Sequence, residues 1–186
     1  DLQTRRRQVL QGDWQRSQVF SLVEPEFNEL AGCTLTVLGA GTIGRGVAAV
    51  ASAFGMDVRL ITSRSSAGEL EIALRQADVL SLHAPLTPAT RGLINAERLS
   101  WLKPSAVLVN LGRGGLIELP ALAEALEQGR LAGAALDVLE KEPPDAELEA
   151  LKKVPNLILT PHIGWASRQA RQRLVAALAG HLREAD

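Results

Sequence analysis

Short apolar runs alternate along this chain with segments whose apolar residues have helical spacing. Six such runs have the length and composition of buried β-strands, and they cover residues 34–38, 57–61, 78–82, 106–110, 134–138 and 157–160. Helical spacing occurs between and after them, at Ile43, Val47, Val50 and Phe54, at Leu119, Leu122, Ala125 and Leu126, and across 167–183. The alternation predicts an α/β fold, a doubly wound parallel sheet with helices on both faces and ligands at the carboxyl ends of the strands.

The pattern divides the chain into three parts of one predicted dinucleotide-binding domain. Residues 34–164 form the Rossmann-like core, and residues 165–186 form a terminal helix. Residues 1–33 are polar and rich in arginine, with isolated large apolar side chains at Trp14, Phe20 and Phe27. Such residues favour a docking arm that contacts a second copy, so we expect a homodimer. A contact with a further domain of the same chain is the alternative.

Composition and charge exclude several classes of function. The 186 residues are 46% hydrophobic, enough for a sizeable core, and the net charge of -1 gives no field that would recruit nucleic acid or an anionic membrane. No apolar run approaches the roughly 18 residues that span a bilayer. A single cysteine, Cys33, leaves no disulfide framework and no thiolate metal cluster. We therefore expect a cytoplasmic protein without a metal site.

A glycine-rich motif follows the first predicted strand and opens a helix. The sequence GAGTIG at 39–44 has the GxGxxG spacing that binds a dinucleotide. Gly39 permits the tight turn, Gly41 lets the backbone approach a pyrophosphate, and Gly44 lets the helix pack closely on the strand. The free N–H groups of the helix then attract the anion. The alternative is an ordinary glycine-rich turn.

The end of the second predicted strand indicates which dinucleotide binds. An NAD site usually has an acidic residue there, whereas residues 62–66 are hydroxyl-rich and contain no carboxylate. The guanidinium of Arg64 offers paired donors to a 2′-phosphate, with Ser63 and Ser65 beside it. This turn predicts a preference for NADP, with NAD also possible. The alternative is an exposed arginine in a polar turn, with relaxed cofactor choice.

Three polar residues follow later strands at the predicted ligand edge: Arg113, Glu142 and His162. Their chemistry is complementary, because an arginine binds a carboxylate with two hydrogen bonds and a histidine moves one proton. A glutamate bonded to that histidine orients the ring and favours the imidazolium. Reduction of a 2-keto acid by hydride needs these functions. Taken singly, each residue could instead be a loop cation, a solvated carboxylate or a structural histidine.

The motifs around these residues carry a family resemblance. In order, they are LHAPLT at 82–87 with Thr90 and LIN at 93–95, LVNLGRGG at 108–115, GAALDV at 133–138 through Glu142-Pro143, and TPHIG at 160–164. Together they resemble the D-isomer-specific 2-hydroxyacid dehydrogenases over nearly the whole chain. GDW at 12–14 and HIGWAS at 162–167 are most similar to the glycerate dehydrogenase and glyoxylate/hydroxypyruvate reductase branch.

The resemblance implies roles for individual residues. Arg113 would bind the substrate carboxylate and carbonyl, His162 would act as acid/base, and Glu142 would be its partner. Asp137 would lie near the nicotinamide carboxamide, and His83 either lines the nicotinamide pocket or has a structural role. The cofactor-binding residues implied by these motifs further include Thr42, Ile43, Pro85, Thr90, Leu111, His162 and Gly164.

The resemblance also sets the expected function and the alternatives to it. It implies the cofactor domain of an NADP-preferring reductase of a small 2-keto acid, glyoxylate or hydroxypyruvate. We expect the substrate domain of the family to lie outside this sequence, and therefore poor activity of the piece alone. One alternative is an NAD(H)-sensing, corepressor-like scaffold, because function does not follow from fold. Another is an NAD-dependent dehydrogenase of a different D-2-hydroxy acid.

Overall fold

The computed structural model describes residues 2–145 and 147–184, and it divides the chain into two compact units, Asp1–Leu30 and Ala31–Asp186. The first unit contains α1 (Leu2–Leu10) and α2 (Asp13–Arg16). The Arg5 guanidinium donates to the carbonyls of the 22–25 segment, including Leu22 at 2.8 Å and Val23 at 2.9 Å. Phe20 and Phe27 are 91% and 79% exposed. The first unit therefore holds its backbone by polar contacts and leaves its large aromatic residues uncovered.

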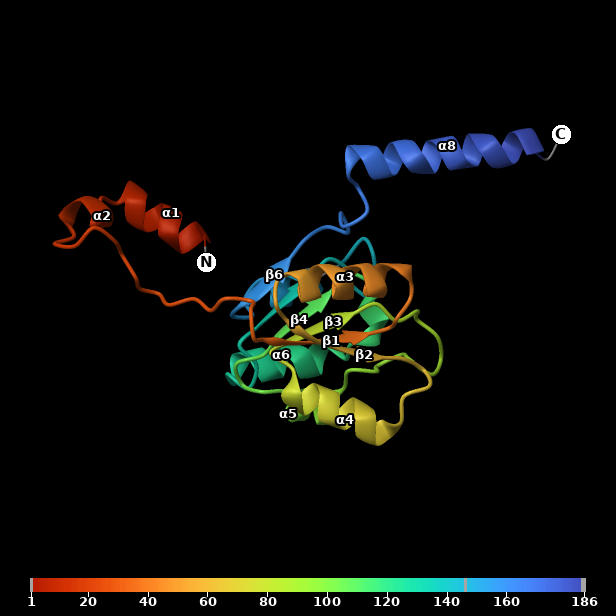
Figure 1. Ribbon diagram of the computed structural model, residues 1–186, viewed down its shortest axis with the longest axis horizontal. Coiled ribbons are helices and arrows are strands. Elements are labelled where there is room, and N and C mark those ends of the chain that lie inside the picture. Colours follow the sequence, from red (N-terminus) through yellow and green to blue (C-terminus); the bar gives the residue numbers. More distant parts are fainter. Residues whose placement is uncertain (1, 146, 185–186) are drawn as a thin grey trace. The chain divides into compact units, whose positions relative to one another are not determined.

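The second unit is built on a six-stranded parallel sheet (Figure 1). The strands are β1 (Thr34–Leu38), β2 (Asp57–Ile61), β3 (Val79–Leu82), β4 (Val107–Asn110), β5 (Gly133–Leu136) and β6 (Leu157–Leu159). Their order in the sheet is β2-β1-β3-β4-β5-β6, and every neighbouring pair is parallel. The predicted α/β fold class is confirmed, and the strand ends differ from the predicted ends by no more than about two residues.

Helices cover both faces of this sheet. The covering helices are α3 (Thr42–Ala53), α4 (Ala67–Gln76), α5 (Ala96–Trp101) and α6 (Leu119–Glu127), and the unit also contains α7 (Glu147–Leu151), α8 (Arg168–Glu184) and a 3₁₀ turn at Gly114–Leu116. Figure 1 shows α3 on one face, and α4, α5 and α6 on the other. This arrangement follows from right-handed crossover connections between parallel strands. The connection from β1 to β2, which contains α3, runs one way across the sheet, whereas the connections from β2 through β5, which contain α4, α5 and α6, run the other way.

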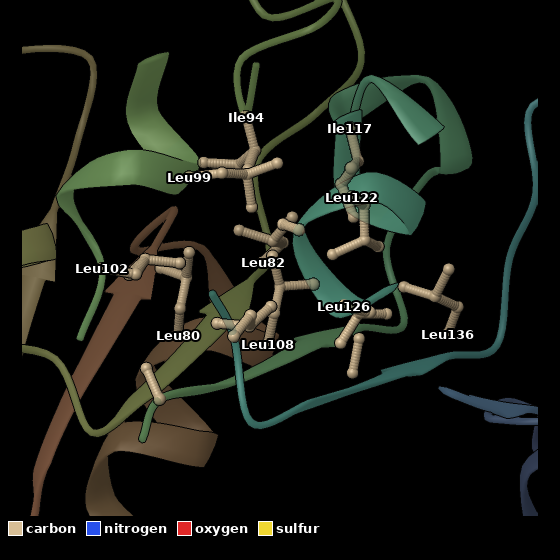
Figure 2. Packing of buried hydrophobic residues seen from close by; sticks show 14 of the residues in the cluster. Leu80, Leu82, Ile94, Leu99, Leu102, Leu108, Ile117, Leu122, Leu126 and Leu136 are labelled. Carbon is tan, nitrogen blue, oxygen red and sulfur yellow. The ribbon is translucent and has the colours of Figure 1, made fainter. Parts of the chain in front are cut away.

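The larger core lies between the sheet and α4, α5 and α6. Leucines of β3, β4 and β5 pack there against the side chains of α5 and α6 (Figure 2). Leu80, Leu108 and Leu122 are fully buried. Burial of each such side chain contributes about 1.5–3 kcal/mol. This core fixes the strands whose carboxyl ends carry the predicted site.

Of the apolar stripe predicted for the first helix of the core, only Val47 packs against the core on β1. The helix itself is present as α3, but Ile43, Val50 and Phe54 are 72%, 58% and 60% exposed. Its buried side consists of the small residues Gly44, Ala48 and Ala51. A Cβ atom on Gly44 would lie 2.0 Å from the carbonyl oxygen of Gly39, so small side chains are required for this close approach.

The two outermost strands also differ from the prediction of buried strands. Three of the five residues of β2 are exposed and the others are partly buried, and Ile158 in β6 is 65% exposed. Both strands are at the edges of the sheet, where only one neighbouring strand covers them.

Of the helices in the described part of the chain, none has the length and hydropathy that crossing a membrane requires.

Candidate active site

The GxGxxG loop passes from β1 into α3 with the backbone that a phosphate site needs. Gly39 has φ +106°, and a Cβ there would lie 2.5 Å from the carbonyl carbon of His83. Gly41 is the N-cap of α3, has open space around it, and provides no side-chain cap. The first N–H groups of α3, beginning at Thr42, Ile43 and Gly44, have no intrahelical acceptor. The loop therefore leaves exposed helix N–H donors where the sequence predicts a phosphate site.

The turn after β2 exposes a cation, and the first carboxylate after it, Glu69, bonds to the backbone at the start of α4. The Arg64 N–H donates to Thr62 Oγ1 at 3.1 Å, and Ser65 Oγ accepts from the Thr62 N–H at 3.2 Å. Glu69 caps α4, accepting from the Ser66 N–H at 2.7 Å, and this backbone hydrogen bond lowers the pKa of Glu69. Ser63 and the side chain of Arg64 are exposed. The turn therefore presents the Arg64 side chain beside the hydroxyls of Thr62 and Ser63.

His83 lies beside the phosphate loop and is held by protein contacts. Its Nε2 atom is 2.8 Å from Ser81 Oγ, and its N–H donates to the carbonyl of Leu38 at 2.7 Å. Partial burial lowers the pKa of His83, so the ring is neutral at pH 7. In the following loop the Thr90 hydroxyl donates to the carbonyl of Pro85 at 2.6 Å. These contacts give the loop a fixed conformation at the edge of the site.

A buried asparagine shapes the loop that carries Arg113. Asn110 ends β4, its Nδ2 donates to the carbonyl of Arg113 at 2.9 Å, and its Oδ1 accepts from the Gly112 N–H at 3.0 Å. The Arg113 side chain is exposed and donates to the carbonyl of Gly112 at 2.7 Å. The sequence interpretation gave Asn110 no role. A polar residue at the end of an otherwise apolar strand is the signal that could have indicated one.

The structure brings Glu142 and His162 together although 20 residues separate them. Glu142 Oε2 lies 2.5 Å from His162 Nδ1, and Oε1 accepts from the Leu139 N–H at 2.8 Å. Partial burial acts to raise the pKa of the Glu142 carboxyl, but the Leu139 and His162 hydrogen bonds and the charges of His162 and Arg113 outweigh it, and the pKa is lowered. Glu142 is therefore a carboxylate at neutral pH, which stabilises a protonated ring.

Asp137 is buried directly after β5 and bonds to protein groups through both carboxylate oxygens. Oδ1 accepts from the Ile163 N–H at 2.9 Å and from the Thr160 hydroxyl, and Oδ2 accepts from the Gly164 N–H at 2.7 Å. Burial acts to raise the pKa of Asp137, but these three hydrogen bonds outweigh it and lower the pKa. The side chain thus binds the loop of His162, a contact that the sequence did not predict.

Two further features concern the space around these residues. Gly164 packs against Leu111, because a Cβ on Gly164 would lie 3.2 Å from Leu111 Cδ2. A cavity of about 670 Å³ lies between the start of α6 and residues 138–140, with the ion pair of Arg91 and Glu140 among its lining. The predicted catalytic and cofactor-binding residues do not line this cavity.

Within the described residues, no three histidine, cysteine or acidic side chains converge to hold a metal ion.

The parallel sheet, the helix N-terminus behind a GxGxxG loop, and the polar residues at the same strand edge define a Rossmann-type dinucleotide-binding domain. The family model for "D-isomer specific 2-hydroxyacid dehydrogenase, NAD binding domain" matches residues 1–164. The chain belongs to this family.

Similar proteins and structures agree with this assignment. The chain is 41% identical over 177 residues to glycerate dehydrogenase of Methylorubrum extorquens, covering 94% of this chain and 56% of that protein. It is 43% identical to glyoxylate reductase of Aeropyrum pernix, covering 83% and 49%. The crystal structure of a glyoxylate reductase from Paecilomyes thermophila matches with a TM-score of 0.78 and 32% identity, covering 96% and 55%. The chain thus spans about half the length of these relatives.

Proposed function

We propose that the chain is the cofactor-binding part of an NADP-preferring oxidoreductase that transfers hydride between nicotinamide and a small 2-keto or 2-hydroxy acid. The observation that carries the proposal is the contact of 2.5 Å between His162 Nδ1 and Glu142 Oε2, at the strand edge that also carries the phosphate loop. Glyoxylate and hydroxypyruvate are the expected substrates, supported by relatives named glycerate dehydrogenase, glyoxylate reductase and hydroxypyruvate reductase.

The residues present fit a bound dinucleotide. The space beside Gly41 is open, with no other atom within 4 Å of a Cβ built there, and the N-terminus of α3 would hold the pyrophosphate through the N–H groups of Thr42, Ile43 and Gly44. The remaining predicted contacts come from the segments that follow β3, β4, β5 and β6, at His83, Pro85, Thr90, Leu111, Asp137, His162 and Gly164. When bound, the reduced nicotinamide supplies the hydride that the keto carbon accepts.

In this proposal Arg113 binds the substrate and His162 moves the proton. The exposed Arg113 guanidinium is free to turn from its own loop toward a substrate carboxylate and carbonyl oxygen. Because Glu142 engages Nδ1 of His162, the Nε2 atom is left to donate a proton to the carbonyl oxygen during reduction. Glu142 keeps the ring oriented and stabilises its positive charge.

The preference for NADP rests on the turn between Thr62 and Ser66. Arg64 is exposed there, and Glu69 is committed to the cap of α4. A titration of the chain with NADPH and NADH tests this. We expect NADPH to bind more tightly than NADH. Arg64→Ala is expected to weaken NADPH binding about tenfold or more, because it removes one charge-assisted contact with the phosphate. Arg59→Ala, which removes an exposed arginine of β2, is the matched control. Equal affinity for both cofactors would contradict the preference.

The activity is tested with the intact protein. We expect it to oxidise NADPH in the presence of glyoxylate or hydroxypyruvate. Cofactor binding without turnover on any 2-keto acid would favour the alternative of a nucleotide-sensing scaffold. Turnover of another 2-keto acid with NADH would favour an NAD-dependent dehydrogenase of a different D-2-hydroxy acid.

A further inference from the structure

His162 has a backbone conformation that its neighbours must hold. Its φ is +53°, in the left-handed region that a non-glycine residue rarely adopts. Its N–H donates to the carbonyl of Asp137 at 2.9 Å and lies 3.0 Å from the carbonyl of Thr160. The position of the imidazole therefore depends on the residues that fix this turn.

The Asp137 carboxylate holds the two residues that follow His162. Its two oxygens each receive one of two successive backbone N–H groups, from Ile163 at 2.9 Å and from Gly164 at 2.7 Å. The carboxylate thus binds a concave pair of amides, as an anion does in a backbone nest. With its carbonyl on the His162 N–H, Asp137 contacts three consecutive residues of the turn.

Thr160 completes this arrangement from the other side of His162. Its N–H donates to the carbonyl of Leu136 at 3.0 Å, which anchors its backbone to the end of β5. Its hydroxyl donates to Asp137 Oδ1, the oxygen that also accepts from Ile163. The hydroxyl therefore restrains rotation of the Asp137 carboxylate. Such a rotation would move its oxygens away from the Ile163 and Gly164 N–H groups.

We propose that Thr160 is a positioning residue for the acid/base histidine. Its hydroxyl keeps the Asp137 carboxylate on the Ile163 and Gly164 amides, and this holds His162 in the conformation in which Nδ1 meets Glu142. The catalytic consequence rests on the proposed function, whereas the structural consequence does not. No role was expected for Thr160 from the family motifs.

The charges near His162 give the proposal a second consequence. The groups that act on it are the carboxylates of Glu142 and Asp137, and Arg113 acts in turn on Glu142. If the Asp137 carboxylate rotates when the Thr160 hydroxyl is lost, the electrostatic field at the imidazole changes. The pH dependence of reduction then changes together with the rate.

The test compares Thr160→Val, which removes the hydroxyl, with Thr160→Ser, which keeps it. Ser100→Ala is the matched control, because the Ser100 hydroxyl donates to the carbonyl of Glu97 within α5. Hydrogen exchange of backbone amides, measured by NMR on the chain, is expected to accelerate about tenfold at Ile163 and Gly164 in Thr160→Val, with core amides such as Leu108 unchanged. Thr160→Ser and Ser100→Ala are expected to exchange as the wild type does.

In the intact protein, Thr160→Val is expected to lower kcat about tenfold, to shift the pH profile of reduction, and to be rescued by Thr160→Ser. Unchanged exchange at Ile163 and Gly164 in Thr160→Val would overturn the proposal. If Thr160→Val fails to fold, Thr160→Ala, which also removes the hydroxyl, decides by the same exchange measurement. Absence of any reductase activity would refute the proposed function and leave the exchange result to decide the positioning role.

Discussion

His162 and Glu142 show how single residues acquire a role from partners that are distant in the sequence. The motifs around each residue predicted an acid/base pair, and the structure places the two side chains in contact. Asn110 lies in the motif of Arg113 and Thr160 in the motif of His162, yet their hydrogen bonds depend on loop conformations that residue type does not reveal. The contact of His162 with Glu142 could therefore be predicted at this scale, whereas the hydrogen bonds of Asn110 and Thr160 could not.

Replacement of Glu142 by Gln tests the pair. The carboxylate is charged at neutral pH because its pKa is lowered, and the amide has no charge to stabilise the imidazolium. In the intact protein we expect the alkaline limb of the reduction profile to shift to lower pH and the rate at pH 7 to fall about tenfold or more. Glu140→Gln, which removes a neighbouring carboxylate paired with Arg91, is the control and should leave the profile unchanged. A profile of Glu142→Gln identical to that of the wild type would remove Glu142 from the mechanism.

Among the secondary-structure elements, apolar runs predicted all six strands. The orientation of α3 was not predictable from hydrophobicity, because its buried side consists of Gly44, Ala48 and Ala51, whereas the larger Ile43, Val50 and Phe54 are exposed. Edge strands were mistaken for buried ones for a related reason. A short apolar run does not reveal how many strands lie beside it.

Asp78 links three elements at the opposite edge of the sheet, and its replacement by Asn is expected to destabilise the domain. Its carboxylate accepts from Lys103 Nζ at 2.7 Å and from the Thr34 N–H at 2.8 Å, and these contacts lower its pKa below 3.8. The stabilisation is fully present above pH 3.8 and is lost as the pH falls through the lower pKa of the folded state. We expect Asp78→Asn to reduce the free energy of unfolding at pH 7 by about 1 kcal/mol in denaturant titrations.

The control is Asp57→Asn, because Asp57 forms an exposed ion pair with Arg59 in β2. An exposed pair contributes little, so this change should stay within about 0.5 kcal/mol. A difference between Asp78→Asn and the wild type that persists unchanged at pH 2 would contradict the assignment to the Asp78 charge.

For the whole molecule, the prediction that remains to be tested is assembly. Trp14 is 54% exposed, and Phe20 and Phe27 are still more exposed. Together with the uncovered Ile43, Val50 and Phe54 of α3, they leave apolar surface that favours an interface. We expect a two-fold homodimer at micromolar concentration in sedimentation experiments, and weaker association after Phe20→Ser. Sedimentation of the wild-type chain as a monomer would contradict this.

The central claim is that His162 is the acid/base group of a 2-keto acid reductase, and the rate of glyoxylate reduction by the intact His162→Ala protein tests it most directly. We predict a fall in kcat of about 10²–10⁴, the usual contribution of general acid/base catalysis. NADPH affinity, measured by titration on the same sample, should stay within a few-fold of the wild type, which separates loss of chemistry from loss of binding. A kcat within about twofold of the wild type would contradict the account.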